Sequence, residues 1–392
     1  MVPHRHFARS GPLGKREWPW IAIAAVASIS CSAIACLAQA ELVAQQPLSA
    51  RGQPVVGFPD GAPAVAPARL ELTADEMAAL RNGRYRAAIA MQALDTPWNS
   101  LQVQAITETL AKYGVDVVAV TDAAQDPQRQ AAQLRGLIEQ RVHVIFSVPI
   151  DPATQTTVYK RVAEAGIKLV LMDNVPHGLQ PGKDYVTVVA SDNEQNAIFA
   201  TEELVKAIDG QGDVALITYS FDSYYSIAAR RRGFEQTLAK YPGVRLAAVE
   251  KFTQPSEVYL KTMRLLGAQP DLKGIFVVWG DPAMQAVAAA KALGRDDIVV
   301  TTNDLGPDTA LYVARGQILA IGAQLPYDLG TAEANAALRA LLGKPVAPYI
   351  SIAALGVKQG NLIPALELVT KRSTPPEIIE ACAGKCSGVS SR

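Results

Sequence analysis

The chain has 392 residues, of which 49% are hydrophobic and 19% are charged, so it can bury a sizeable core and is not a disordered chain. Its 37 basic and 37 acidic residues cancel, and no basic stripe is visible, which argues against nucleic acid as a partner.

The first 40 residues have the layout of a secretory signal. Four basic residues precede an apolar run that ends in the small-x-small pattern Ala38-Gln-Ala40. We therefore expect residues 1–40 to be a signal peptide and the mature protein to lie in the periplasm. An uncleaved anchor helix is one alternative, and a lipid anchor on Cys36, which follows Ala33-Ile-Ala, is another.

Residues 41–69 carry five prolines among Ala, Gly and Gln without periodicity, which predicts an extended or disordered spacer. A short helix is expected within 70–83, because Thr73 and Glu76 have the spacing of a capping box.

From Arg86 onward, short apolar runs alternate with amphipathic segments. The runs are AAIAM, VDVVAV, VHVIFSV, KLVLM, YVTVVA, VALITY, VRLAAV, GIFVVW, DIVVTT and ILAIGAQ, and the helices between them are expected near 127–140, 154–165, 194–208, 226–240, 256–266, 282–292 and 328–341. This rhythm predicts an α/β fold with parallel strands buried on both faces. Periodicity leaves open a barrel, one large sheet or two doubly wound domains.

Ligands of parallel α/β folds bind beyond the carboxyl ends of the strands. The residues at or beyond the ends of the runs include Trp98, Asp173, Trp279 and Asn303. Helix caps account for many Asp and Asn residues at such positions, but caps do not need Trp. Carboxylates and amides beside aromatic rings are what sugar recognition requires, because hydroxyls need planar hydrogen-bonding partners and C–H faces stack on rings.

Enzyme and metal signatures are lacking. Gly210-x-Gly212-x-x-Ala215 lies between a helix and a strand, the wrong order for a dinucleotide fingerprint, and only His143 and His177 remain after export. We expect no catalysis, no cofactor and no metal. Cys382 and Cys386 either bridge each other or stay as free thiols in a terminal tail.

The chain resembles the sugar-binding periplasmic proteins of the ribose/galactose type, from about Arg86 to Val357. The segments that carry the resemblance are TPWNSLQ, SVPIDP, LVLMDN, VVASDN, AARRRGF, GDPAM and AQLPYDLG. The resemblance implies two Rossmann-like lobes joined by three crossing segments, with the ligand between them and a hinge closure. The lobes would be 84–191 plus 325–352 and 192–324 plus 353–369, with 370–392 as a tail.

The resemblance also implies roles for single residues. The implied ligand-binding residues are Gln92, Trp98, Asn99, Asp173, Asn174, Arg230, Trp279, Asp281, Asn303, Asp304 and Gln324. The chain departs from the family at Asn99, where many relatives have a second aromatic residue, and at Asn174, where they often have arginine. These departures argue against plain ribose as the ligand.

The implied function is capture of a sugar or polyol and its delivery to an ABC permease in the inner membrane, with the binding protein acting as a monomer. A ligand-presenting sensory protein for a chemoreceptor or histidine kinase is the alternative, because the same cleft would serve it.

Overall fold

The computed structural model describes residues 62–220 and 224–386. The expected signal peptide and most of the expected spacer lie outside these residues. Within them, no helix is both long and apolar enough to cross a membrane.

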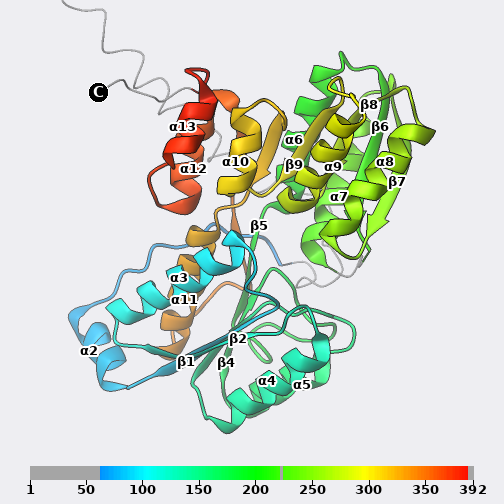
Figure 1. The fold of residues 1–392 in the computed structure, drawn as a ribbon. Helices are drawn as coiled ribbons and strands as arrows, with labels where there is room; N and C mark the ends of the chain where they lie inside the picture. Colours follow the sequence, from blue (N-terminus) through cyan, green and yellow to red (C-terminus); the bar gives the residue numbers. More distant parts are fainter. Residues whose placement is uncertain (1–61, 221–223, 387–392) are drawn as a thin grey trace, which may run out of the picture. The chain divides into compact units, whose positions relative to one another are not determined.

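The first sheet has six parallel strands in the order β11-β5-β4-β3-β1-β2 (Figure 1). Their bounds are β1 (Arg86–Met91), β2 (Asp116–Asp122), β3 (Val144–Ser147), β4 (Lys168–Met172), β5 (Thr187–Ser191) and β11 (Tyr349–Ile352). Helices α4 (Pro127–Glu139) and α5 (Thr156–Glu164) share one hydrophobic cluster with this sheet, and α3 (Pro97–Lys112) and α11 (Pro326–Leu341) share another.

The second sheet has the order β12-β10-β9-β8-β6-β7 and is parallel except for the β10–β12 pair. Its strands are β6 (Gly212–Tyr219), β7 (Val244–Phe252), β8 (Leu272–Val277), β9 (Val299–Asn303), β10 (Ala320–Ala323) and β12 (Leu355–Lys358). Its helices are α6 (Asn193–Ala207), α7 (Tyr225–Leu238), α8 (Val258–Ala268), α9 (Gly280–Ala292), α10 (Pro307–Ala314), α12 (Leu362–Thr370) and α13 (Pro376–Cys382), with short 3₁₀ turns η2 (Pro255–Glu257) and η3 (Gln359–Asn361).

All ten apolar runs form strands, which confirms the predicted α/β fold with two sheets. Strands β11 and β12 and helices α10, α12 and α13 were not anticipated. The chain passes from one sheet to the other between β5 and α6, between β10 and α11, and between β11 and β12. The exact lobe boundaries expected from the sequence stay a prediction.

Two segments expected outside the lobes are attached to them. Helix α2 (Ala74–Asn82) has the predicted capping box of Thr73 and Glu76, and Val65, from the expected spacer, pairs with Ile350 at the edge of the first sheet. Because β11 is an edge strand, its outer backbone groups pair with Val65, which donates to the Tyr349 carbonyl oxygen and accepts from the Ser351 N–H.

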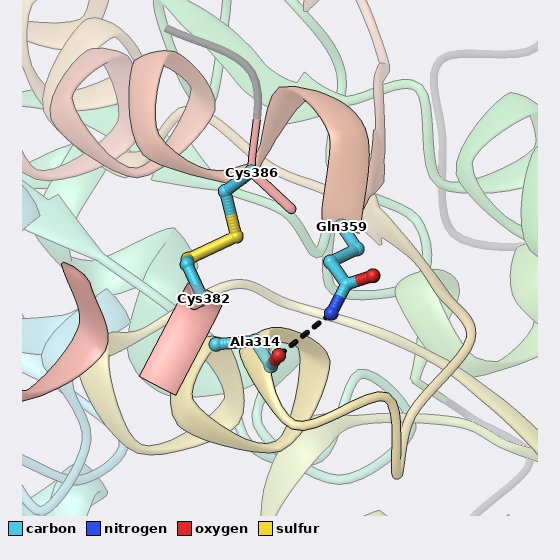
Figure 2. The surroundings of a disulfide bond; sticks show 4 residues. All are labelled: Ala314, Gln359, Cys382 and Cys386. Carbon is cyan, nitrogen blue, oxygen red and sulfur yellow. Dashed lines mark hydrogen bonds between the residues drawn. A yellow bond between two sulfur atoms is a disulfide. The ribbon is translucent and has the colours of Figure 1, made fainter. Parts of the chain in front are cut away.

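Helix α13, in the expected tail, packs against helix α10 of the second lobe. Cys382, at the end of α13, is disulfide-bonded to Cys386, and both belong to the second sheet's hydrophobic cluster (Figure 2). Figure 2 also shows Gln359 donating from its Nε2 to the Ala314 carbonyl oxygen at 2.7 Å, which ties η3 to the end of α10. The bridge thus lies in a packed part of the fold.

Candidate binding cleft

A cavity of about 220 Å³ lies where loops from the two sheets face each other. In both sheets the strand order reverses, between β1 and β3 and between β6 and β8, so the loops that follow these strands diverge and leave a crevice. A second hollow shares Trp98, Trp279, Asp281 and Asp304 with the first. We call the two hollows together the cleft.

Ten of the eleven expected site residues line the cavity, namely Gln92, Trp98, Asn99, Asp173, Asn174, Arg230, Trp279, Asp281, Asp304 and Gln324. Asn303 does not line it. Its Nδ2 donates to the Gly322 carbonyl oxygen at 3.1 Å, and its side chain is fully buried between β9 and β10. The adjacent Asp304 occupies the place in the cleft that we expected for Asn303.

The turn after β1 is built by local capping. Thr96 is the N-cap of α3 and Pro97 its first residue. The cap sets the direction of the helix, and this places Trp98 at the cavity wall. The Trp98 ring packs on the core of the first sheet, but its buried Nε1 has no hydrogen-bond partner among the described residues.

Asn99 and Gln92 form a hydrogen-bonded relay in the same turn. Asn99 donates from Nδ2 to Asp95 Oδ1 at 3.4 Å and accepts at Oδ1 from Gln92 Nε2 at 2.9 Å. Both amides are buried, and Gln92 Oε1 has no hydrogen-bond partner in the described part of the chain. Asn99 therefore supports Gln92 and offers no aromatic wall.

Asp173 follows β4 with a left-handed backbone, φ 56°, a conformation that Asp tolerates better than most residues. Its side chain is 6% exposed, and Oδ1 has no partner among the described residues. Burial raises the pKa of Asp173 to about 7, the positive charge of Arg230 opposes the shift, and the negative charge of Asp304 adds to it.

Asn174 connects the two lobes. Its Nδ2 donates to the Pro149 carbonyl oxygen at 3.1 Å, and its Oδ1 accepts from the backbone N–H of Tyr225 at 2.9 Å, at the start of α7. The side chain lines the cavity, but its two polar atoms are already engaged within the protein.

Arg230 and Asp304 form a partly buried, bidentate ion pair, with both N–O distances 2.9 Å. Arg230 also donates to Asn193 Oδ1 and to the Val278 carbonyl oxygen, so the guanidinium is held on three sides. Gln324 donates from Nε2 to Asp304 Oδ1 at 2.8 Å, and none of the described residues hydrogen-bonds its buried Oε1.

Trp279 closes the second sheet's side of the cleft. It packs edge-on against Tyr219 and Phe252, with ring centroids 5.4 and 4.9 Å apart. These contacts fix the plane of the indole, which is what stacking against a ligand ring needs.

Sequence reasoning missed several cavity residues, among them Asp95, Gln125, Tyr219, Tyr224 and Gln254. Most of them follow β1, β2, β6 or β7, so the strand-end rule could have found them. Tyr224 donates from its hydroxyl to Gln125 Oε1 at 3.0 Å, a second link between the lobes.

Residues 87–345 match the family model of the periplasmic binding protein domain. The chain is 26% identical over 279 residues to the ribose import binding protein of Escherichia coli (strain K12), which covers 69% of this chain and 90% of the relative. It is 24% identical over 239 residues to a D-apiose import binding protein of Actinobacillus succinogenes, which covers 60% and 73%. A solute-binding protein of an ABC transporter from Bacillus halodurans C-125, solved with bound myo-inositol, superposes with a TM-score of 0.66 at 20% identity and covers 72% and 97% of the two chains.

Two α/β lobes with a polar, aromatic-lined cleft between their strand ends define a ligand receptor. The chain belongs to the periplasmic binding protein family, whose activity is binding and not catalysis. Its place is therefore outside the cytoplasm.

Proposed function

We propose that the protein captures a sugar or polyol in the cleft and delivers it to an ABC importer. The observation that supports this proposal is that one cavity is lined by two aromatic residues, Trp98 and Trp279, and by three residues with buried oxygens. These three are Gln92, Asp173 and Gln324, and the oxygens have no partner among the described residues. Rings serve the apolar C–H face of a sugar, and the oxygens accept hydrogen bonds from its hydroxyls. The relatives named for ribose and D-apiose import support this ligand class.

The size of the cavity favours a single-ring ligand. At about 220 Å³ it lies below the roughly 300–1,000 Å³ of pockets for drug-sized molecules. The ten cavity residues expected from the sequence are the proposed binding residues.

The delivery pathway completes the proposal. Residues 1–40 direct export, with a lipid on Cys36 as the variant form, and the mature monomer docks on a permease in the inner membrane. The lobes, 84–191 plus 325–352 and 192–324 plus 353–369, close about the three crossing segments.

The test is a thermal-shift panel of sugars and polyols, with pentoses, hexoses, cyclitols and their amino derivatives, on the purified mature protein. A ligand present at 100 times its Kd adds about 2.7 kcal/mol to the unfolding free energy, which raises the melting temperature by several degrees. A matched panel of amino acids should give no shift. If no member of the sugar and polyol panel shifts the melting temperature, the proposed function is wrong.

A further inference from the structure

The cleft carries an excess of negative charge. Five carboxyl groups line its two hollows, against one cation, the guanidinium of Arg230. They are Asp95, Asp173, Asp281, Asp304 and Asp308.

Among the described residues, the ion pair of Arg230 is with Asp304, and its positive charge also opposes the rise that burial causes in the pKa of Asp173. The guanidinium donates twice to the Asp304 carboxylate and otherwise to neutral groups, and the arginine side chain is 3% exposed. Among the residues that the structure describes, none forms an ion pair with Asp95 or Asp281. A ligand in the cleft therefore meets uncompensated carboxylates from both lobes.

The pKa of Asp281 reflects this excess of negative charge. Burial raises the pKa of Asp281, and the negative charges of Asp304, Asp95 and Asp308 raise it further. Helix dipoles favour carboxylates at these places, since Asp281 and Asp308 lie in the first turns of α9 and α10 and Asp95 directly precedes the N-cap of α3. A helix N-terminus carries only about half a positive charge, so it does not neutralise a full carboxylate.

The carboxylates also orient the amides of the cleft. A carboxylate only accepts hydrogen bonds, so each amide beside one must turn its NH₂ group toward it. Asp304 thereby turns the Oε1 of Gln324 away from itself, and Asp95, through Asn99, does the same for Gln92 Oε1. Both oxygens, like Asp173 Oδ1, belong to cavity-lining residues more than nine-tenths buried, and none has a partner among the described residues.

The cleft thus offers a ligand several acceptors, negative charge and aromatic walls. An ammonium group has three donors and no acceptor, and it is attracted both to carboxylates and to the faces of Trp rings. We infer that the ligand is a hydroxylated ring that carries a protonated amine, an amino sugar or an aminated cyclitol. This inference rests on the proposed function and narrows its ligand class.

A metal ion does not account for the carboxylates. In residues 62–220 and 224–386, no three His, Cys, Asp or Glu side chains come close enough to hold one. The carboxylates are spread over both lobes, which suits an organic cation with hydroxyls and does not suit a compact ion.

Isothermal titration calorimetry on the ligand-free mature protein tests the inference with matched molecules. Glucosamine, galactosamine and an inosamine are each compared with the parent sugar or inositol and with the uncharged N-acetyl form. At least one amine should bind ten-fold or more tightly than both of its neutral counterparts, and this preference should shrink as salt is raised.

Two variants test whether the preference for amines over neutral sugars arises in the cleft. Asp281→Asn and Asp95→Asn should each reduce the ratio of amine to neutral affinity at least three-fold. Asp296→Asn changes the net charge equally at an exposed position outside the cleft and should leave the ratio unchanged.

The outcomes separate the inference from the proposed function. If neutral sugars bind as tightly as their amines, or if both variants keep the full amine preference, the inference is wrong and sugar capture stands. If neither amines nor neutral sugars nor polyols bind, both are wrong.

Discussion

Trp98 and Asp173 contribute to the cleft in different ways. Trp98 offers a ring face and one unpartnered donor, whereas Asp173 offers a buried oxygen whose ionisation depends on what lies beside it. The two side chains therefore call for different experiments.

Replacing Trp98 with Ala should weaken ligand binding by about 2 kcal/mol, roughly thirty-fold, because the stacking surface is lost. Trp98→Phe keeps a ring and should retain most of the affinity. Calorimetry on both variants measures the difference, and circular dichroism checks that they are folded. Wild-type affinity in Trp98→Ala would remove this residue from the site.

Asp173 should make the ligand-free protein less stable as pH rises from about 4 to 7. Its pKa is raised to about 7 in the folded state and is about 3.9 when unfolded, so the folded state holds a proton that unfolding releases in this window. The stabilising effect is complete below pH 4 and is lost as pH approaches 7. Three pKa units correspond to on the order of 4 kcal/mol.

The comparison is urea unfolding of wild type and Asp173→Asn at several pH values. The asparagine variant cannot ionise, so the stability difference between the two proteins should change across this window in the stated direction. Glu333, fully buried, has its pKa raised by burial and by Asp173, and it remains in both proteins. Parallel pH curves would contradict the assigned shift.

At the scale of elements, helices α3 and α11 approach closely at Gly330. A Cβ atom on Gly330 would lie 2.6 Å from the Gln102 carbonyl oxygen and 2.9 Å from the Ala105 Cβ. This contact fixes α3, the helix that begins with the cleft residues Trp98 and Asn99.

Gly330→Ala should therefore destabilise the protein by about 1–2 kcal/mol, since overpacking outweighs the gain in helix propensity. Gly136→Ala is the matched control. Gly136 lies inside α4 with open space at its Cβ position, so alanine there should stabilise by about 0.5–1 kcal/mol. Denaturant unfolding measures the change in unfolding free energy of both variants, which should be opposite in sign. The same change in both would refute the packing argument.

The Cys382–Cys386 bridge closes a short loop at the end of α13. A loop of this length is worth about 2 kcal/mol in the chain-entropy model. The double variant Cys382→Ala, Cys386→Ala should lose about that much stability, and a reductant should lower the stability of wild type but not that of the variant. An unchanged wild type in reductant would show that the bridge is not stabilising.

At the scale of the whole molecule, the lobes are linked by three chain crossings and by side-chain contacts at Asn174 and Tyr224. A ligand that contacts both walls of the cleft favours the arrangement in which both contacts are made. Small-angle X-ray scattering should then show a smaller radius of gyration with ligand than without. Trp98→Ala at the same ligand concentration is the control, and an identical radius with saturating ligand would contradict closure.

The amino-acid sequence by itself determined the ten strands β1 to β10 and the edge of each sheet where a ligand would bind. Apolar runs of four to eight residues that alternate with amphipathic segments favour strands buried on both faces, and the carboxyl ends of parallel strands lie at the same edge of a sheet. Local capping residues likewise predicted the start of α2, where Thr73 and Glu76 form the capping box.

Only the tertiary structure decided which strand-end groups are available to a ligand. Asn303 hydrogen-bonds Gly322 between β9 and β10, and Asn174 hydrogen-bonds Tyr225 across the lobes. Arg230 forms an ion pair with Asp304. Each of these partners is distant in sequence. Charge balance in a cavity depends on which side chains meet there, and periodicity carries no information on that. The surplus of carboxylates over cations is therefore visible only once the two sheets are folded.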